Sequence, residues 1–121
     1  MSDTQHKKPD REWAQAVWKV VSEIPAGHVL TYGEVARLSG APRYARRVAQ
    51  ALRWAPRDLE LPWHRVINAQ GKLSMPAESP AYARQKALLE AEGVCFEKEK
   101  IDLQRYGYQG ALDKLFWGEF A

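Results

Sequence analysis

The sequence predicts a single, mainly α-helical domain with short strands, built around a winged-helix-like helix-turn-helix. Three observations support this fold class. The chain has 121 residues, which suits one domain. Apolar residues near the N-terminus recur at the spacing of one helix face. Between residues 31 and 53, signals for two short helices flank a turn that contains glycine.

The first expected helix runs from an N-cap at Asp10 to about Glu23. Its apolar stripe consists of Trp13, Ala16, Val17, Val20, Val21 and Ile24. Pro25-Ala26-Gly27 ends this helix, and residues 28–30 then form a short extended piece. The polar residues 1–9 are expected to be a disordered tail.

The helix-turn-helix is predicted from its start and stop signals. Thr31 and Glu34 have the spacing of a capping box, which opens a short helix that ends at Ser39-Gly40. Gly40 suits the left-handed position after a helix. Pro42 suits the first turn of the second helix, which runs to about Arg53.

The second helix of this pair has one packing face and one basic face. Its packing face is formed by Ala41, Ala45, Val48 and Leu52. Its other side carries Arg43, Arg46, Gln50 and Arg53, with Tyr44 and Arg47 beside them. Residues 35–57 contain six arginines and no acid, which favours a polyanionic partner such as DNA over a merely solvated basic face.

The second half of the chain is expected to hold one more helix and short strands. A proline-bounded loop at 55–62 leads to an extended stretch at 63–67, a turn at 68–71 and a returning strand at 72–74. A helix at 81–92 buries Leu88 and Ala91 and ends at Gly93, and residues 94–96 are extended. Residues 104–121 are an apolar extension that we expect to pack on the domain formed by residues 10–103.

Several classes of protein are disfavoured. No apolar run reaches the roughly 20 residues that span a bilayer, and the N-terminus lacks a signal-peptide pattern, so we expect a cytoplasmic protein with no membrane contact. The one cysteine, Cys95, excludes a disulfide within the chain and is expected to be buried and structural. The three histidines lack metal-ligand spacing, so we expect no metal and no cofactor. Nothing demands an oligomer, and a monomer is expected.

The stretch Pro62-Trp63-His64-Arg65-Val66-Ile67 resembles the active-site signature of the O6-alkylguanine-DNA alkyltransferases, which reads Pro-Cys-His-Arg-Val. Three further motifs match that family in the same order and extend the resemblance over residues 13–103: Ile24 to Ala36, which leads into the helix-turn-helix, Ala45-Arg46-Arg47-Val48, and Leu88 to Gly93. The resemblance implies the fold of the family's C-terminal DNA-binding domain.

Trp63 occupies the position of the family's alkyl-accepting cysteine. Alkyl transfer needs a nucleophile, and an indole nitrogen is only a hydrogen-bond donor at neutral pH. The chain therefore resembles the alkyltransferase-like proteins, the non-catalytic branch of the family. That resemblance implies a protein that is not an enzyme. It would flip O6-alkylguanine out of double-stranded DNA, block its repair by alkyltransferases and flag it for nucleotide excision repair. A bacterial source would suggest a UvrA-type partner and association with the nucleoid.

The resemblance also assigns roles to individual residues. Tyr32 would press on the phosphate 3′ to the target, and Arg46 would be the finger that fills the gap left by the flipped base. Trp63 would form the floor or wall of the lesion pocket, with His64 and Glu92 as a structural remnant of the catalytic relay. The full expected pocket comprises Tyr32, Pro62, Trp63, His64, Arg65, Val66, Leu73, Ser74 and Met75. The expected DNA contacts, made in the minor groove, come from Thr31, Tyr32, Arg43, Tyr44, Arg46, Arg47, Gln50 and Arg53.

Two other functions remain open from the residues. An active alkyltransferase could use an acceptor other than cysteine, which would appear as alkyl label on the protein. A sequence-specific transcription factor of winged-helix type would share the helix-turn-helix. It would not explain the motif at 62–67.

Overall fold

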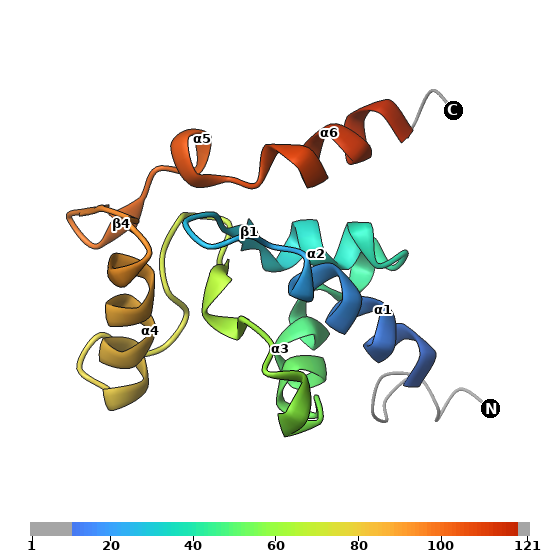
Figure 1. Cartoon of the computed structure of the whole chain (residues 1–121), viewed down its shortest axis with the longest axis horizontal. Coiled ribbons are helices and arrows are strands. Elements are labelled where there is room, and N and C mark those ends of the chain that lie inside the picture. The colour runs from blue at the N-terminus through green and yellow to red at the C-terminus, as the bar shows by residue number, and fades with distance from the viewer. Residues whose placement is uncertain (1–10, 119–121) are drawn as a thin grey trace.

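The computed structural model describes residues 11–118, and it describes side chains as far as Asp113. The fold is mainly α-helical with short strands, as the sequence predicts (Figure 1). The expected N-cap at Asp10 and the expected tail at 1–9 lie outside the described residues. In chain order the helices and strands are α1 (Arg11–Ser22), β1 (Leu30–Thr31), α2 (Tyr32–Leu38), α3 (Ala45–Arg53), β2 (Val66–Ile67), α4 (Pro80–Ala91), β3 (Phe96–Glu97), β4 (Lys100–Ile101), α5 (Leu103–Tyr106) and α6 (Gln109–Gly118).

Helices α1, α2 and α3 enclose the main core. The predicted stripe of α1 contributes Val17, Val21 and the following Ile24, all of them buried. Val48 of α3 is fully buried against the same cluster. The indole nitrogen of Trp18 on α1 donates to the carbonyl of Ala51 at 2.7 Å, which ties α1 to α3 without leaving a polar atom unpaired.

Strands β1 and β2 form a two-stranded parallel pair in which Leu30 lies opposite Val66 and Thr31 opposite Ile67. The stretch at 63–67 is expected to be extended throughout. Only Val66 and Ile67 form a strand, and Trp63–Arg65 is a turn of 3₁₀ helix, so the expectation is wrong for these three residues. The expected strand at 72–74 is also wrong. After the turn at 68–71, the amide of Asn68 donates to the carbonyl of Lys72, but the chain does not continue as a hairpin.

Helix α4 packs over a second core cluster through Tyr82, Gln85 and Leu89. The expected burial of Leu88 and Ala91 is wrong, since both are exposed and α4 turns a different face inward. After α4, β3 and β4 form an antiparallel hairpin. The cysteine before this hairpin, Cys95, is exposed, so its expected role as a buried structural residue is also wrong.

The chain after β4 returns to the main core. The amide of Val29 donates to the carbonyl of Tyr106 at 2.8 Å, and the amide of Tyr108 donates back to the carbonyl of Val29 at 3.0 Å. Ala111 and Leu112 then pack on the cluster formed by α1–α3, and α6 lies along α2 (Figure 1). The expected packing of the apolar side chains at 115–120 concerns side chains that the structure does not describe.

Candidate nucleic-acid interface

The helix-turn-helix is fixed by hydrogen bonds at its start and by a glycine at its turn. The amide of Glu34 donates to the hydroxyl of Thr31 at 3.1 Å, and the amide of Thr31 donates to the carboxylate of Glu34 at 2.8 Å. The predicted capping box is thus complete. Gly40 has a φ of +89°, the left-handed conformation that turns the chain from α2 toward α3.

One side of α3 is basic and open to solvent. Arg46, Gln50 and Arg53 on α3 and Arg43 just before it are all exposed, whereas Val48 and Ala51 face the core. The helix begins later than expected, because Pro42–Tyr44 is a turn of 3₁₀ helix and α3 starts at Ala45. Among the described residues, no carboxylate forms an ion pair with these three arginines. This face is available to bind phosphates.

Tyr44 and Arg47 differ from the rest of this face because they are half-buried. The Tyr44 ring meets the Trp13 ring edge-on at a centroid distance of 5.2 Å. The guanidinium of Arg47 lies 4.5 Å from the centroid of the same tyrosine ring. These contacts hold the start of α3 against α1. The ring of Tyr44 therefore supports the basic surface rather than projecting from it.

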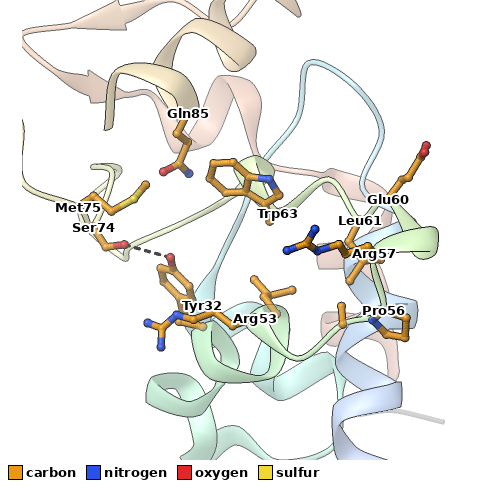
Figure 2. A pocket seen from close by; sticks show the side chains of 13 residues that line it. Tyr32, Arg53, Pro56, Arg57, Glu60, Leu61, Trp63, Ser74, Met75 and Gln85 are labelled. Carbon is orange, nitrogen blue, oxygen red and sulfur yellow. Dashed lines mark hydrogen bonds between the residues drawn. The ribbon is translucent and has the colours of Figure 1, made fainter. Parts of the chain in front are cut away.

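A cavity of about 510 Å³ lies next to the basic face, between α3, the loop at 55–62, the turn that carries Trp63, and residues 74–75 (Figure 2). This volume is in the range of sites that enclose an organic molecule. The cavity is lined by Tyr32, Ala49, Leu52, Arg53, Ala55, Pro56, Arg57, Glu60, Leu61, Trp63, Ser74, Met75 and Gln85.

Tyr32 and Ser74 close one side of the cavity. Their hydroxyl oxygens are 3.0 Å apart and form the hydrogen bond drawn in Figure 2. Tyr32 is positioned because it follows the cap residue Thr31 at the start of α2. The bond joins the helix-turn-helix to the segment after β2 on this side of the cavity.

The backbone of the turn that presents Trp63 is held by hydrogen bonds from the side chain of Gln85. This side chain is only 2% exposed, and its amide nitrogen donates to the carbonyls of His64 at 3.0 Å and Val66 at 3.2 Å. Satisfying both carbonyls in this way makes the turn energetically acceptable inside the protein. The half-buried indole of Trp63 therefore enters the cavity from a rigid support.

Glu92, the residue after α4, joins three segments of the chain behind the cavity. Its carboxylate accepts from Nε2 of His64 at 2.7 Å, from the guanidinium of Arg65 at 2.7 Å and from the amide of Gly27 at 3.2 Å. Arg65 also donates to the carbonyl of Ile24 at 2.8 Å. Burial acts to raise the pKa of Glu92, but the hydrogen bonds from Arg65, His64 and Gly27 outweigh it and lower the pKa to about 2.

The structure thus separates the expected pocket residues into two groups. Tyr32, Trp63, Ser74 and Met75 line the cavity. Pro62, His64, Arg65, Val66 and Leu73 do not. His64, Val66 and Leu73 are buried in the protein, and His64 and Arg65 belong to the network around Glu92.

Sequence reasoning missed three polar residues of the cavity, Arg57, Glu60 and Gln85. Gln85 could have been noticed as a polar residue four positions before Leu89, on the face of α4 that packs. Arg57 ends the acid-free stretch of arginines, but no local signal shows that the loop folds back over the cavity. Within residues 11–118 no cluster of histidine, cysteine or acidic side chains has the arrangement of a metal site, and no helix there is long and apolar enough to cross a membrane.

The fold and site define a helix-turn-helix domain with an organic-molecule-sized cavity beside its basic helix. The family described as "6-O-methylguanine DNA methyltransferase, DNA binding domain" matches residues 12–94, and the chain belongs to this family.

Two curated relatives and one solved structure are similar to the chain. The "DNA base-flipping protein" of Escherichia coli (strain K12) is 46% identical over 105 residues, covering 84% of this chain and 80% of the relative. "Alkyltransferase-like protein 1" of Schizosaccharomyces pombe is 48% identical over 83 residues, covering 69% of this chain and 77% of the relative. The crystal structure of S. pombe Atl1 in complex with damaged DNA containing O6-carboxymethylguanine has a TM-score of 0.72 and 41% identity, and covers 82% of this chain and 96% of the other.

Proposed function

We propose that this protein binds O6-alkylguanine in double-stranded DNA by flipping the base into the cavity, and that it leaves the alkyl group in place. The observation that carries the proposal is that the indole of Trp63 lines the cavity. The resemblance of residues 62–67 to the family's active-site signature implies that Trp63 replaces the accepting cysteine. The names of the two curated relatives, one a base-flipping protein and one alkyltransferase-like, support the same function.

Flipping requires a group that replaces the extruded base. Arg46 is the candidate, because it is exposed on the basic face of α3 and its planar guanidinium can stack between base pairs. Arg43 and Arg53 flank it and would bind phosphates, together with backbone amides at the helix starts. Tyr32, on the edge of the cavity, would press on the phosphate 3′ to the target. We place α3 in the minor groove, whose degenerate code suits a protein that searches many sequences for damage.

The absence of alkyl transfer follows from the groups around the cavity. Trp63 offers no nucleophile, and the hydroxyl of Ser74 is hydrogen-bonded to that of Tyr32. His64, which Glu92 holds through Nε2, could still serve as a base, but Trp63 gives it no acceptor group to activate. A flipped base would instead stack on or pack against the indole, a contact worth about 1–3 kcal/mol.

A binding titration at fixed salt tests this proposal. It compares a duplex containing one O6-methylguanine with the same duplex containing guanine, and repeats both titrations with Trp63→Ala. We expect the wild-type protein to prefer the lesion and the variant to lose most of that preference. Equal affinity of the wild-type protein for both duplexes would leave only a general DNA-binding domain.

We further propose that the bound lesion is withheld from alkyltransferases and passed to nucleotide excision repair, through a UvrA-type protein if the source is bacterial. The reason is chemical: a base held in this cavity cannot enter a second one, and another system must then remove it. As a DNA-binding protein acting as a monomer, it would work in the cytoplasm, at the nucleoid in a bacterium. Adding it before an active alkyltransferase should slow repair of the duplex, and unchanged repair would refute the blocking role.

A further inference from the structure

We propose that Arg57 makes the cavity select O6-alkyl groups that end in a carboxylate. This inference rests on the proposed function and assigns a specificity-determining residue to the same site. Arg57 lies in the loop at 55–62 and is separate from the basic face of α3. Figure 2 shows its guanidinium directed toward Trp63, while its backbone lies at the edge of the cavity.

The loop that carries Arg57 is held in one conformation by its own hydrogen bonds. Arg57–Leu59 is a turn of 3₁₀ helix that follows Pro56, whose ring fixes φ near −57°. The amide of Leu59 donates to the carbonyl of Pro56, and the amide of Glu60 donates to the carbonyl of Arg57, each at 3.1 Å. The Cα of Arg57 is therefore fixed relative to the cavity, and only its side chain adjusts to a ligand.

The charged groups that line the cavity are Arg53, Arg57 and Glu60. The carboxylate of Glu60 points away from the cavity and from Arg57 in Figure 2. Within residues 11–118, no carboxylate forms an ion pair with the guanidinium of Arg57. The other polar side-chain groups there are neutral, namely the hydroxyls of Tyr32 and Ser74, the amide of Gln85 and the indole N–H of Trp63. The field inside the cavity is consequently positive on the side of Arg57.

A guanidinium in this position discriminates by charge as well as by hydrogen bonding. It matches a carboxylate with two parallel N–H donors, whereas a neutral amide or methyl group offers one acceptor or none. Opposite the loop, Met75 supplies an apolar wall that has no such preference. A carboxylate on the alkyl group would therefore turn toward Arg57, and a methyl group would leave the guanidinium in water.

The test uses three duplexes that differ only in the O6 substituent of one guanine: methyl, carboxymethyl and carbamoylmethyl. The last two have nearly the same shape and differ by one charge. The measured quantity is the ratio of Kd for carbamoylmethyl to Kd for carboxymethyl. Because Arg57 is exposed, we expect Arg57→Gln to lower this ratio by about fivefold at low salt, and by less at higher salt. Its effect on the Kd for the methyl adduct should be clearly smaller than its effect on the Kd for the carboxymethyl adduct.

Arg43→Gln is the matched control, since Arg43 is another exposed arginine but does not line the cavity. It should weaken binding of all three duplexes equally and leave the ratio unchanged. An unchanged ratio in Arg57→Gln would overturn the inference, and so would an equal loss for all three duplexes, which would make Arg57 a phosphate contact. If the wild-type protein binds the methyl adduct no better than guanine, the proposed function itself fails, and the inference with it.

Discussion

Replacing Glu92 by glutamine tests whether the network behind the cavity holds the domain together. The carboxylate joins the turn after Trp63, the end of α4 and the segment between α1 and β1. Glutamine keeps the shape of the side chain and one acceptor oxygen, but it leaves the charge of Arg65 unpaired in a partly buried place. We therefore expect the variant to fold and to be less stable.

The size of the effect follows from the pKa of Glu92. Its fall from 4.5 to about 2 corresponds to about 3 kcal/mol of unfolding free energy at pH 7, at about 1.36 kcal/mol for each unit. The carboxyl is only 16% exposed, so solvent screens little of this interaction. Because the pKa in the folded state is the lower one, the stabilisation is complete above about pH 5 and is lost as the pH falls through 4.5 toward 2.

Urea unfolding at pH 7, 5, 4 and 3 measures this dependence directly. The difference in unfolding free energy between the wild-type protein and Glu92→Gln should be about 3 kcal/mol at pH 7 and should shrink to about 1 kcal/mol at pH 3. Glu78→Gln is the control, because Glu78 is exposed and forms no ion pair among the described residues. A difference below about 0.5 kcal/mol at pH 7, or one that does not change with pH, would refute the reasoning.

Three further predictions concern the DNA-binding surface. Trp63→Ala should weaken binding to the O6-methylguanine duplex by about 1–3 kcal/mol, seen as a rise in Kd, with little change for undamaged DNA. Arg46→Ala should reduce flipping of the lesion, measured as a smaller rise in fluorescence of a 2-aminopurine opposite or beside the lesion site, whereas an unchanged signal would remove Arg46 from that role. Thr31→Ala should cost about 1 kcal/mol of unfolding free energy through loss of the cap on α2. Ser22→Ala, which removes only an exposed hydrogen bond to the carbonyl of Lys19 at the end of α1, should cost clearly less.

The local features of the fold could be predicted because their causes lie within a few residues. Thr31 and Glu34 form the capping box that their spacing indicates, and Gly40 adopts the left-handed conformation that ends α2. The start of α4 is expected at residue 81 and lies at Pro80; its cap, Ser79, is a local feature that sequence reasoning missed. These elements place Tyr32 and the basic face of α3 correctly without knowledge of the tertiary structure.

The remaining features depend on contacts between distant residues. β2 pairs in parallel with β1, from which it is separated in sequence by the whole helix-turn-helix. Because its partner is so distant in the chain, nothing near residues 72–74 indicates that a hairpin is absent. Leu88 and Leu89 are equally apolar, and only the direction from which α4 meets the core decides that Leu89 is buried. The contribution of Arg57 to the cavity depends on the fold-back of an irregular loop, which periodicity does not describe.

The most direct test of recognition without alkyl transfer examines both the protein and the DNA after incubation. The protein is held in excess over a duplex containing O6-methylguanine, then its intact mass is determined and the recovered DNA is digested to nucleosides. We predict an unchanged protein mass and full recovery of O6-methylguanine. A protein heavier by one methyl group, with guanine in place of the lesion, would show that the protein is an enzyme and would contradict the role assigned to Trp63.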